Sequence, residues 1–138
     1  MTDRAARAWS NLRILLQERG DRRREVTEAL GMSFFRVKAL RALARDPMTL
    51  RDLADRLLTD RPYTSLVVED LASRGLVERT ANPADRRSKI VKVTEAGAEV
   101  AASAETILNR PPAALYELPE EDLAALDRIA AHLLHLTD

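Results

Sequence analysis

The sequence contains no cysteine and little glycine, and each shortage removes a class of function. Without cysteine the chain forms no disulfide, binds no metal through thiolates and senses no oxidant through a thiol. Its 4 glycines form no glycine-rich phosphate loop and no nucleophile elbow. No cluster of histidine and carboxylate side chains has the spacing of a catalytic or metal site. We therefore expect no enzymatic activity and no cofactor.

Long apolar runs are also missing. No stretch approaches the roughly 18 consecutive apolar residues that a membrane-spanning helix needs, and the first residues lack the apolar segment of a signal peptide. Hydrophobic residues make up 46% and charged residues 32% of the 138 positions, which is typical of a folded globular domain. We expect a cytoplasmic protein that forms one domain, or one domain with helical extensions.

The formal net charge is zero, which on its own argues against a nucleic-acid binder, but the charges are segregated. From Glu95 onward nine acidic residues face two basic ones, a net charge of −7. Residues 1–94 hold the other 20 basic and 13 acidic residues, a net charge of +7. Such asymmetry predicts that one region meets a polyanion and the other does not.

The most informative basic segment is the loop over residues 82–89. Asn-Pro followed by Ala-Asp is turn chemistry. The flanking residues 76–80 and 90–94 alternate apolar and polar side chains, which predicts a two-stranded hairpin. A tip that carries Arg86 and Arg87 suits a narrow minor groove, which attracts guanidinium groups. From the loop alone, a solvated surface hairpin is the alternative.

Helical periodicity dominates the rest of the chain. Ser33, Thr49 and Thr94 are placed to cap helices. Leu58 is expected to point inward at the end of its helix. The predicted helices cover about residues 5–19, 24–30, 33–44, 50–58, 62–74 and 95–109, with a last one from 119 onward.

The helices at 50–58 and 62–74 are joined by a short turn, which predicts a helix-turn-helix, and the hairpin that follows is then a wing. The second helix should bury Val67, Val68 and Leu71. Its more exposed residues should be Tyr63, Ser65, Leu66, Glu69 and Asp70.

Over about residues 33–97 the chain resembles the MarR family of winged helix-turn-helix regulators. Residues 49–57 resemble the first helix of the pair, and residues 68–79 resemble the end of the second helix with the first wing strand. Asp85-Arg86-Arg87 matches the Asp-x-Arg wing signature, and residues 93–97 match the Leu-Thr-x-x-Gly passage from strand to helix. The predicted fold is mainly α: a winged helix-turn-helix with a two-stranded β-hairpin wing and a helical dimerisation lobe formed by the N- and C-terminal helices.

The resemblance implies a homodimer that binds pseudo-palindromic double-stranded DNA as a transcriptional regulator, with repression the expected effect. It also implies release from DNA by a small, often aromatic, ligand. The implied segments are residues 1–32 for N-terminal dimerisation helices, 33–94 for the DNA-binding lobe and 95–138 for C-terminal dimerisation helices. A winged helix used for protein contacts, with weak or no DNA binding, is the alternative.

The wing match makes Arg87 the candidate minor-groove arginine, Asp85 its intramolecular partner and Arg86 a phosphate contact. The second helix departs from the family, because Leu66, Glu69 and Asp70 stand where many relatives carry Arg or Lys. No residue between Tyr63 and Ser73 can make the bidentate guanine contact. The expected DNA contacts are Arg61, Tyr63, Thr64, Ser65, Leu66, Arg86, Arg87 and Lys89.

Two weaker patterns have ordinary explanations. Trp9, Phe34 and Phe35 could line a pocket for an aromatic effector, although aromatic residues at helical spacing are more often core. His132 and His135 have the i, i+3 spacing of metal ligands. With one such pair and no cysteine nearby, a surface or dimer-face role is favoured over a metal site.

Overall fold

The computed structural model describes residues 3–136, which form two compact units. One unit comprises residues 21–109, and the other comprises residues 3–20 with 110–136. The expected fold class is confirmed, since helices predominate and are accompanied by one small antiparallel sheet. No helix in the described part of the chain is long and apolar enough to cross a membrane.

The first unit contains five helices, and side-chain caps fix where four of them begin. As predicted, the hydroxyls of Ser33, Thr49 and Thr94 each accept a hydrogen bond from a backbone N–H in the first turn that follows. Asp60 caps the helix α5 (Arg61–Ser73), whose first turn contains Pro62, a residue suited to that position. The helices are α2 (Arg23–Leu30), α3 (Phe34–Arg45), α4 (Leu50–Arg56), α5 (Arg61–Ser73) and α6 (Glu95–Leu108).

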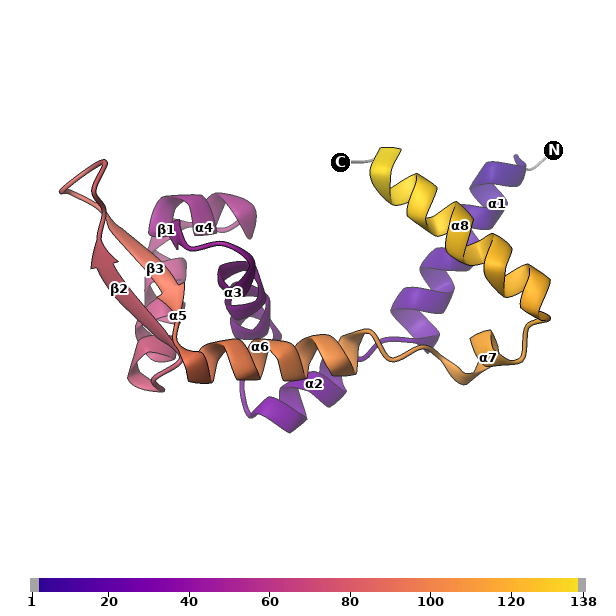
Figure 1. The fold of residues 1–138 in the computed structure, drawn as a ribbon, viewed down its shortest axis with the longest axis horizontal. Coiled ribbons are helices and arrows are strands. Elements are labelled where there is room, and N and C mark those ends of the chain that lie inside the picture. The colour runs from indigo at the N-terminus through magenta and orange to yellow at the C-terminus, as the bar shows by residue number, and fades with distance from the viewer. Residues whose placement is uncertain (1–2, 137–138) are drawn as a thin grey trace. The chain divides into compact units, whose positions relative to one another are not determined.

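The predicted hairpin is present as β2 (Val77–Ala81) and β3 (Lys89–Val93). It stands beside α4 and α5, and its loop projects beyond the helices (Figure 1). A strand that the sequence did not predict, β1 (Met48–Thr49), pairs with the other side of β3. The sheet is therefore three-stranded, in the order β1-β3-β2. Two residues are too few to show a strand period, so this strand had no sequence signal.

One apolar core holds this unit together. Its largest fully buried side chains include Leu40 and Leu43 of α3, Leu53 of α4 and Leu71 of α5. Packing of α3 against α2, β3 and α6 completes the core. Val67, Val68 and Leu71 are buried as predicted, so this stripe turns the opposite side of α5 outward.

The prediction for Leu58 is wrong. The helix α4 ends at Arg56, and the Leu58 side chain is 93% exposed. Leu58 has a φ of 55°, in the left-handed region that ends many helices. Glycine usually occupies such a position, but residues 56–60 contain none. The turn into α5 therefore places a leucine there, with a cost of about 1 kcal/mol.

The second unit contains helices with no buried residue. These are α1 (Arg4–Ile14), the π-helical turn η1 (Leu15–Arg19), α7 (Ala113–Tyr116) and α8 (Glu120–Leu136). The helix predicted over 5–19 therefore changes to π geometry near its end, and the short α7 was not predicted. Within the described ranges 3–20 and 110–136 no side chain is fully buried. The large apolar side chains that remain exposed include Trp9, Leu16, Tyr116, Ile129, Leu133, Leu134 and Leu136.

The segments expected at 1–32, 33–94 and 95–138 were divided by their role in dimerisation, which stays a prediction. Within one chain, α2 and α6 pack against each other and against α3. Both helices therefore belong to the same compact unit as the helix-turn-helix.

Gly97 allows α6 to start close to the loop before β2. A Cβ at this position would lie 1.9 Å from the carbonyl oxygen of Leu76. Alanine is about 1 kcal/mol more favourable than glycine within a helix, but this overlap reverses the preference. We predict that Gly97→Ala lowers the free energy of unfolding in urea by about 2 kcal/mol or more.

The neighbouring exposed residue provides the control. Ala98→Gly should cost only the propensity difference of about 1 kcal/mol. A Gly97→Ala variant as stable as the wild type would show that the close approach is not required.

Candidate nucleic-acid interface

A groove of about 720 Å³ lies between α4, α5 and the hairpin. Five basic and three acidic residues line it, so its charged lining is net positive. All five basic residues are exposed, and within residues 3–136 none of them is in an ion pair. Their positive charge is therefore available to an anionic partner. The basic residues are Arg51, Arg61, Arg79, Arg87 and Lys89, and the acidic ones are Asp52, Asp55 and Asp85.

Local hydrogen bonds shape the hairpin loop, as its turn chemistry predicts. The Asn82 Oδ1 atom accepts from the Ala84 N–H at 3.0 Å, and the Asn82 Nδ2 atom donates to the Ser88 hydroxyl at 2.9 Å. The Asp85 Oδ1 atom accepts from the Arg87 N–H at 2.9 Å. These bonds close the loop on both sides of its tip.

The expected partnership of Asp85 and Arg87 therefore runs through the main chain of Arg87. No ion pair joins the two side chains in the described part of the protein. Asp85 holds the backbone turn and leaves the guanidinium groups of Arg86 and Arg87 exposed. On the strands, the Lys92 Nζ atom is paired with the Glu78 Oε1 atom at 3.3 Å, so Lys92 adds little to the net positive charge of the hairpin.

The first turns of α5 present mixed chemistry beside this groove. Arg61 and Ser65 line it. The Tyr63 ring packs at a tilt of 57° on Phe35, with 4.9 Å between centroids, and stays 40% exposed. Leu66 is 62% exposed. The outward side of α5 thus offers one cation, a phenol, a hydroxyl and an apolar side chain.

Thr64 is the exception among the expected contacts. Its side chain is fully buried, and its hydroxyl donates to the Asp60 carbonyl oxygen at 2.8 Å. A buried side chain cannot reach DNA, so the prediction for Thr64 is wrong. Its position on the same face as Val67, Val68 and Leu71 explains the burial, because residues three or four apart share a helix face.

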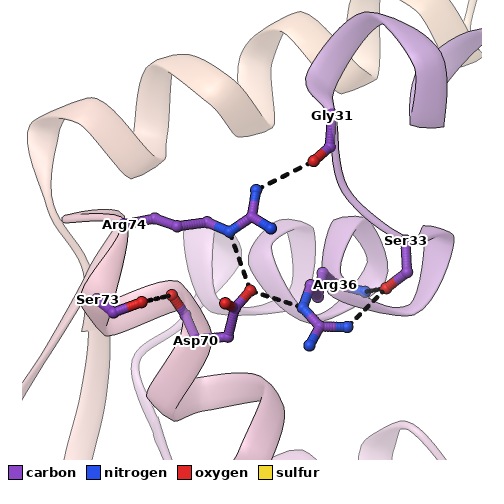
Figure 2. A network of polar contacts seen from close by, with 6 residues as sticks. All are labelled: Gly31, Ser33, Arg36, Asp70, Ser73 and Arg74. Carbon is purple, nitrogen blue, oxygen red and sulfur yellow. Dashed lines mark hydrogen bonds and ion pairs between the residues drawn. The ribbon is translucent and has the colours of Figure 1, made fainter.

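Asp70 does not belong to an exposed acidic face either. Its Oδ2 atom accepts from the Arg36 Nε atom at 2.7 Å and from the Arg74 Nε atom at 2.9 Å (Figure 2). The hydrogen bond from Arg36 lowers the pKa of the Asp70 carboxyl below its ordinary value. Asp70 therefore points toward α3 as a carboxylate whose negative charge is balanced by the two arginines. Of the two neighbouring acidic residues, Glu69 is the exposed one.

The aromatic residues considered for a ligand pocket lie in two different units. Phe34 and Phe35 pack against the core, as the ordinary explanation for them anticipates. Trp9, on α1, is 66% exposed. An effector pocket at these residues stays a prediction. His132 and His135 are both exposed, and residues 3–136 contain no group of three or more potential ligands arranged to hold a metal ion.

Two of the basic groove residues, Arg51 and Arg79, were missing from the predicted set. Arg79 lies two residues after the buried Val77, on the same face of β2, and is opposite Val91 of β3. That alternation could have indicated Arg79. Arg51 follows the Thr49 cap in α4, and only the assembled fold brings it to the wing.

Comparison with known proteins identifies the fold as that of a family of regulators. Residues 30–88 match the MarR family. An HTH-type transcriptional regulator of Mycobacterium tuberculosis is 31% identical over 135 residues, which cover 97% of this chain and 90% of the relative. A regulator of Mycobacterium bovis matches with the same identity and coverage.

Solved structures share the fold at lower identity. The apo form of Escherichia coli MarR has a TM-score of 0.71 and 22% identity, covering 91% of this chain and 96% of that one. A Staphylococcus aureus MepR mutant bound to an oligodeoxyribonucleotide has a TM-score of 0.65 and 18% identity, covering 99% and 100% of the two chains. The family match over residues 30–88 and the two mycobacterial relatives show that this chain belongs to the MarR family of transcriptional regulators and is not an enzyme.

Proposed function

We propose that this protein is a repressor that binds a pseudo-palindromic DNA operator as a homodimer. The groove between α5 and the wing carries this proposal, because five exposed basic side chains line it. Positive side chains on a concave surface favour a polyanion. The likeness to a MepR structure that contains an oligodeoxyribonucleotide supports DNA as that polyanion.

The two sides of the groove would have different tasks. As the recognition helix, α5 would enter the major groove and present Tyr63, Ser65 and Leu66 to base edges, with apolar contact to thymine methyl groups. Arg87 of the wing would enter the adjacent minor groove. Arg51, Arg61, Arg86 and Lys89 would meet phosphates, which position the protein without reading sequence.

A second copy of the chain would cover the apolar side chains left exposed in the unit formed by 3–20 and 110–136. Several large apolar residues of α1 and α8 are half or more exposed there, including Trp9 at 66% and Leu136 at 66%. Such surface is characteristic of an interface. A two-fold dimer would place two recognition helices about 34–36 Å apart, in successive major grooves.

Release by a small ligand completes the proposed regulation. A ligand that bound one geometry of the dimer more tightly would shift the population away from the spacing that fits DNA. Binding of an aromatic effector near Trp9, Phe34 or Phe35 is part of this proposal.

The wing assignment is tested by Arg87→Ala. We expect operator binding, measured by fluorescence anisotropy at physiological salt, to weaken by about 1–3 kcal/mol, the size of a lost groove contact. Arg24→Ala is the control, because Arg24 is an exposed arginine paired with Glu28 on α2, outside the groove. Equal affinities of the Arg87→Ala and Arg24→Ala variants would refute a DNA contact by Arg87.

The dimer is tested by sedimentation equilibrium at micromolar concentration. We expect twice the chain mass of 15.4 kDa. Ile129→Asp places a charge on an apolar side chain that is 47% exposed in one chain, so it should separate the dimer and leave residues 21–109 folded. A wild-type protein that sediments as a single chain would contradict the dimer.

A further inference from the structure

One carboxylate fixes the C-terminal half of α5. The Asp70 Oδ2 atom accepts hydrogen bonds from two arginines, at 2.7 Å from the Arg36 Nε atom and at 2.9 Å from the Arg74 Nε atom. Arg36 belongs to α3, and Arg74 is the C-cap residue of α5. The last turns of α5 are thus tied to a different helix through a single oxygen atom.

Both arginines extend the network to the junction of α2 and α3. The Arg74 Nη1 atom donates to the Gly31 carbonyl oxygen at 3.1 Å, where α2 ends in a left-handed turn. The Arg36 Nη1 atom donates to the Ser33 hydroxyl at 3.1 Å, where α3 begins. Figure 2 shows these side chains converging between the three helices.

Partial burial makes the Arg36–Asp70 pair a stronger restraint than a surface ion pair. The side chains of Arg36 and Asp70 are 25% and 32% exposed, against 91% and 67% for Arg24 and Glu28. Exposed pairs contribute little, because water screens them and ordering two long side chains costs entropy. Hydrogen bonds between charged groups that are partly shielded from water hold their geometry better.

The restrained end of α5 lies close to the end that faces the groove. Leu66 precedes Asp70 by four residues, about 6 Å along a helix axis. A helix moves as a rod over this length, so a change of tilt at Asp70 displaces Tyr63 and Leu66.

The side chains of α5 make its contacts with DNA bases sensitive to that tilt. Between Tyr63 and Ser73 the helix has no long cationic side chain that could follow a base as the helix shifts. Contacts by a short hydroxyl or an apolar side chain weaken within a fraction of an ångström. The long arginine and lysine side chains of the wing tolerate the same displacement.

We propose that Asp70 is a positioning residue: its bonds to Arg36 and Arg74 set the tilt of the recognition helix, and thereby the discrimination between operator and other DNA, without contact with DNA. This inference rests on the proposed DNA-binding function. It assigns discrimination to a carboxylate that faces α3 and leaves most of the general affinity to the basic groove.

The test compares Asp70→Asn with Glu69→Gln. Both substitutions remove one negative charge from α5, but Glu69 is exposed and forms no ion pair in the described structure. The probes are a duplex selected from a random-sequence library by the wild-type protein and a scrambled duplex of the same composition. We expect Asp70→Asn to lower the ratio of the two affinities roughly tenfold, the size of a lost base contact. The ratio for Glu69→Gln should stay near that of the wild type.

A purely structural role would reduce the amount of active protein and weaken both affinities equally, so the ratio separates the two roles. Circular dichroism at the assay temperature checks that each variant is folded. If Asp70→Asn is unfolded, Arg36→Lys replaces it, because lysine keeps the charge and loses the planar fork of donors. A smaller fall in the ratio is then expected.

An unchanged ratio in a folded variant, with a wild-type protein that does discriminate, would overturn the role of Asp70 and leave the proposed function intact. A wild-type protein that selects no duplex from the library would overturn the proposed function itself.

Discussion

The burial of one face of α5 is the constraint on which the rest of the winged-helix unit depends. Thr64, Val67, Val68 and Leu71 are all 0–1% exposed, so the helix cannot rotate about its axis without bringing polar residues into the core. Val77 of β2 and Val91 of β3 are buried in the same core and attach the hairpin to it. One apolar cluster therefore determines which side of α5 faces outward and where the wing stands. The groove between them is a consequence of that packing.

The position of each charged residue in this fold determines whether it faces the groove. The exposed basic side chains of the groove come from α4, the start of α5 and the hairpin, while the exposed middle of α5 is apolar or acidic. Asp70, which would repel phosphate if it faced outward, is turned toward two arginines. A chain with no net charge can in this way present a positive surface to a polyanion.

Features that depend on neighbours in sequence were predictable. The caps at Ser33, Thr49 and Thr94, the hairpin and the buried stripe of α5 all follow from short-range patterns. Features that depend on distant partners were not. The strand β1 exists only because β3 offers it an edge, and Arg36 lies 34 positions before Asp70. Among the candidate contacts, those on the wing loop could be predicted because turn chemistry and charge are local. Arg51 was missed because three separate elements assemble the groove.

The salt dependence of DNA binding tests whether the basic groove binds the phosphate backbone. Each phosphate contact releases counterions, so the logarithm of the binding constant should fall linearly with the logarithm of salt concentration, by about 0.9 per contact. For Arg51→Ala, which removes one groove cation, we expect a slope that is shallower by about 0.9. An identical slope for wild type and variant, or binding that does not depend on salt, would rule out phosphate contacts by the groove.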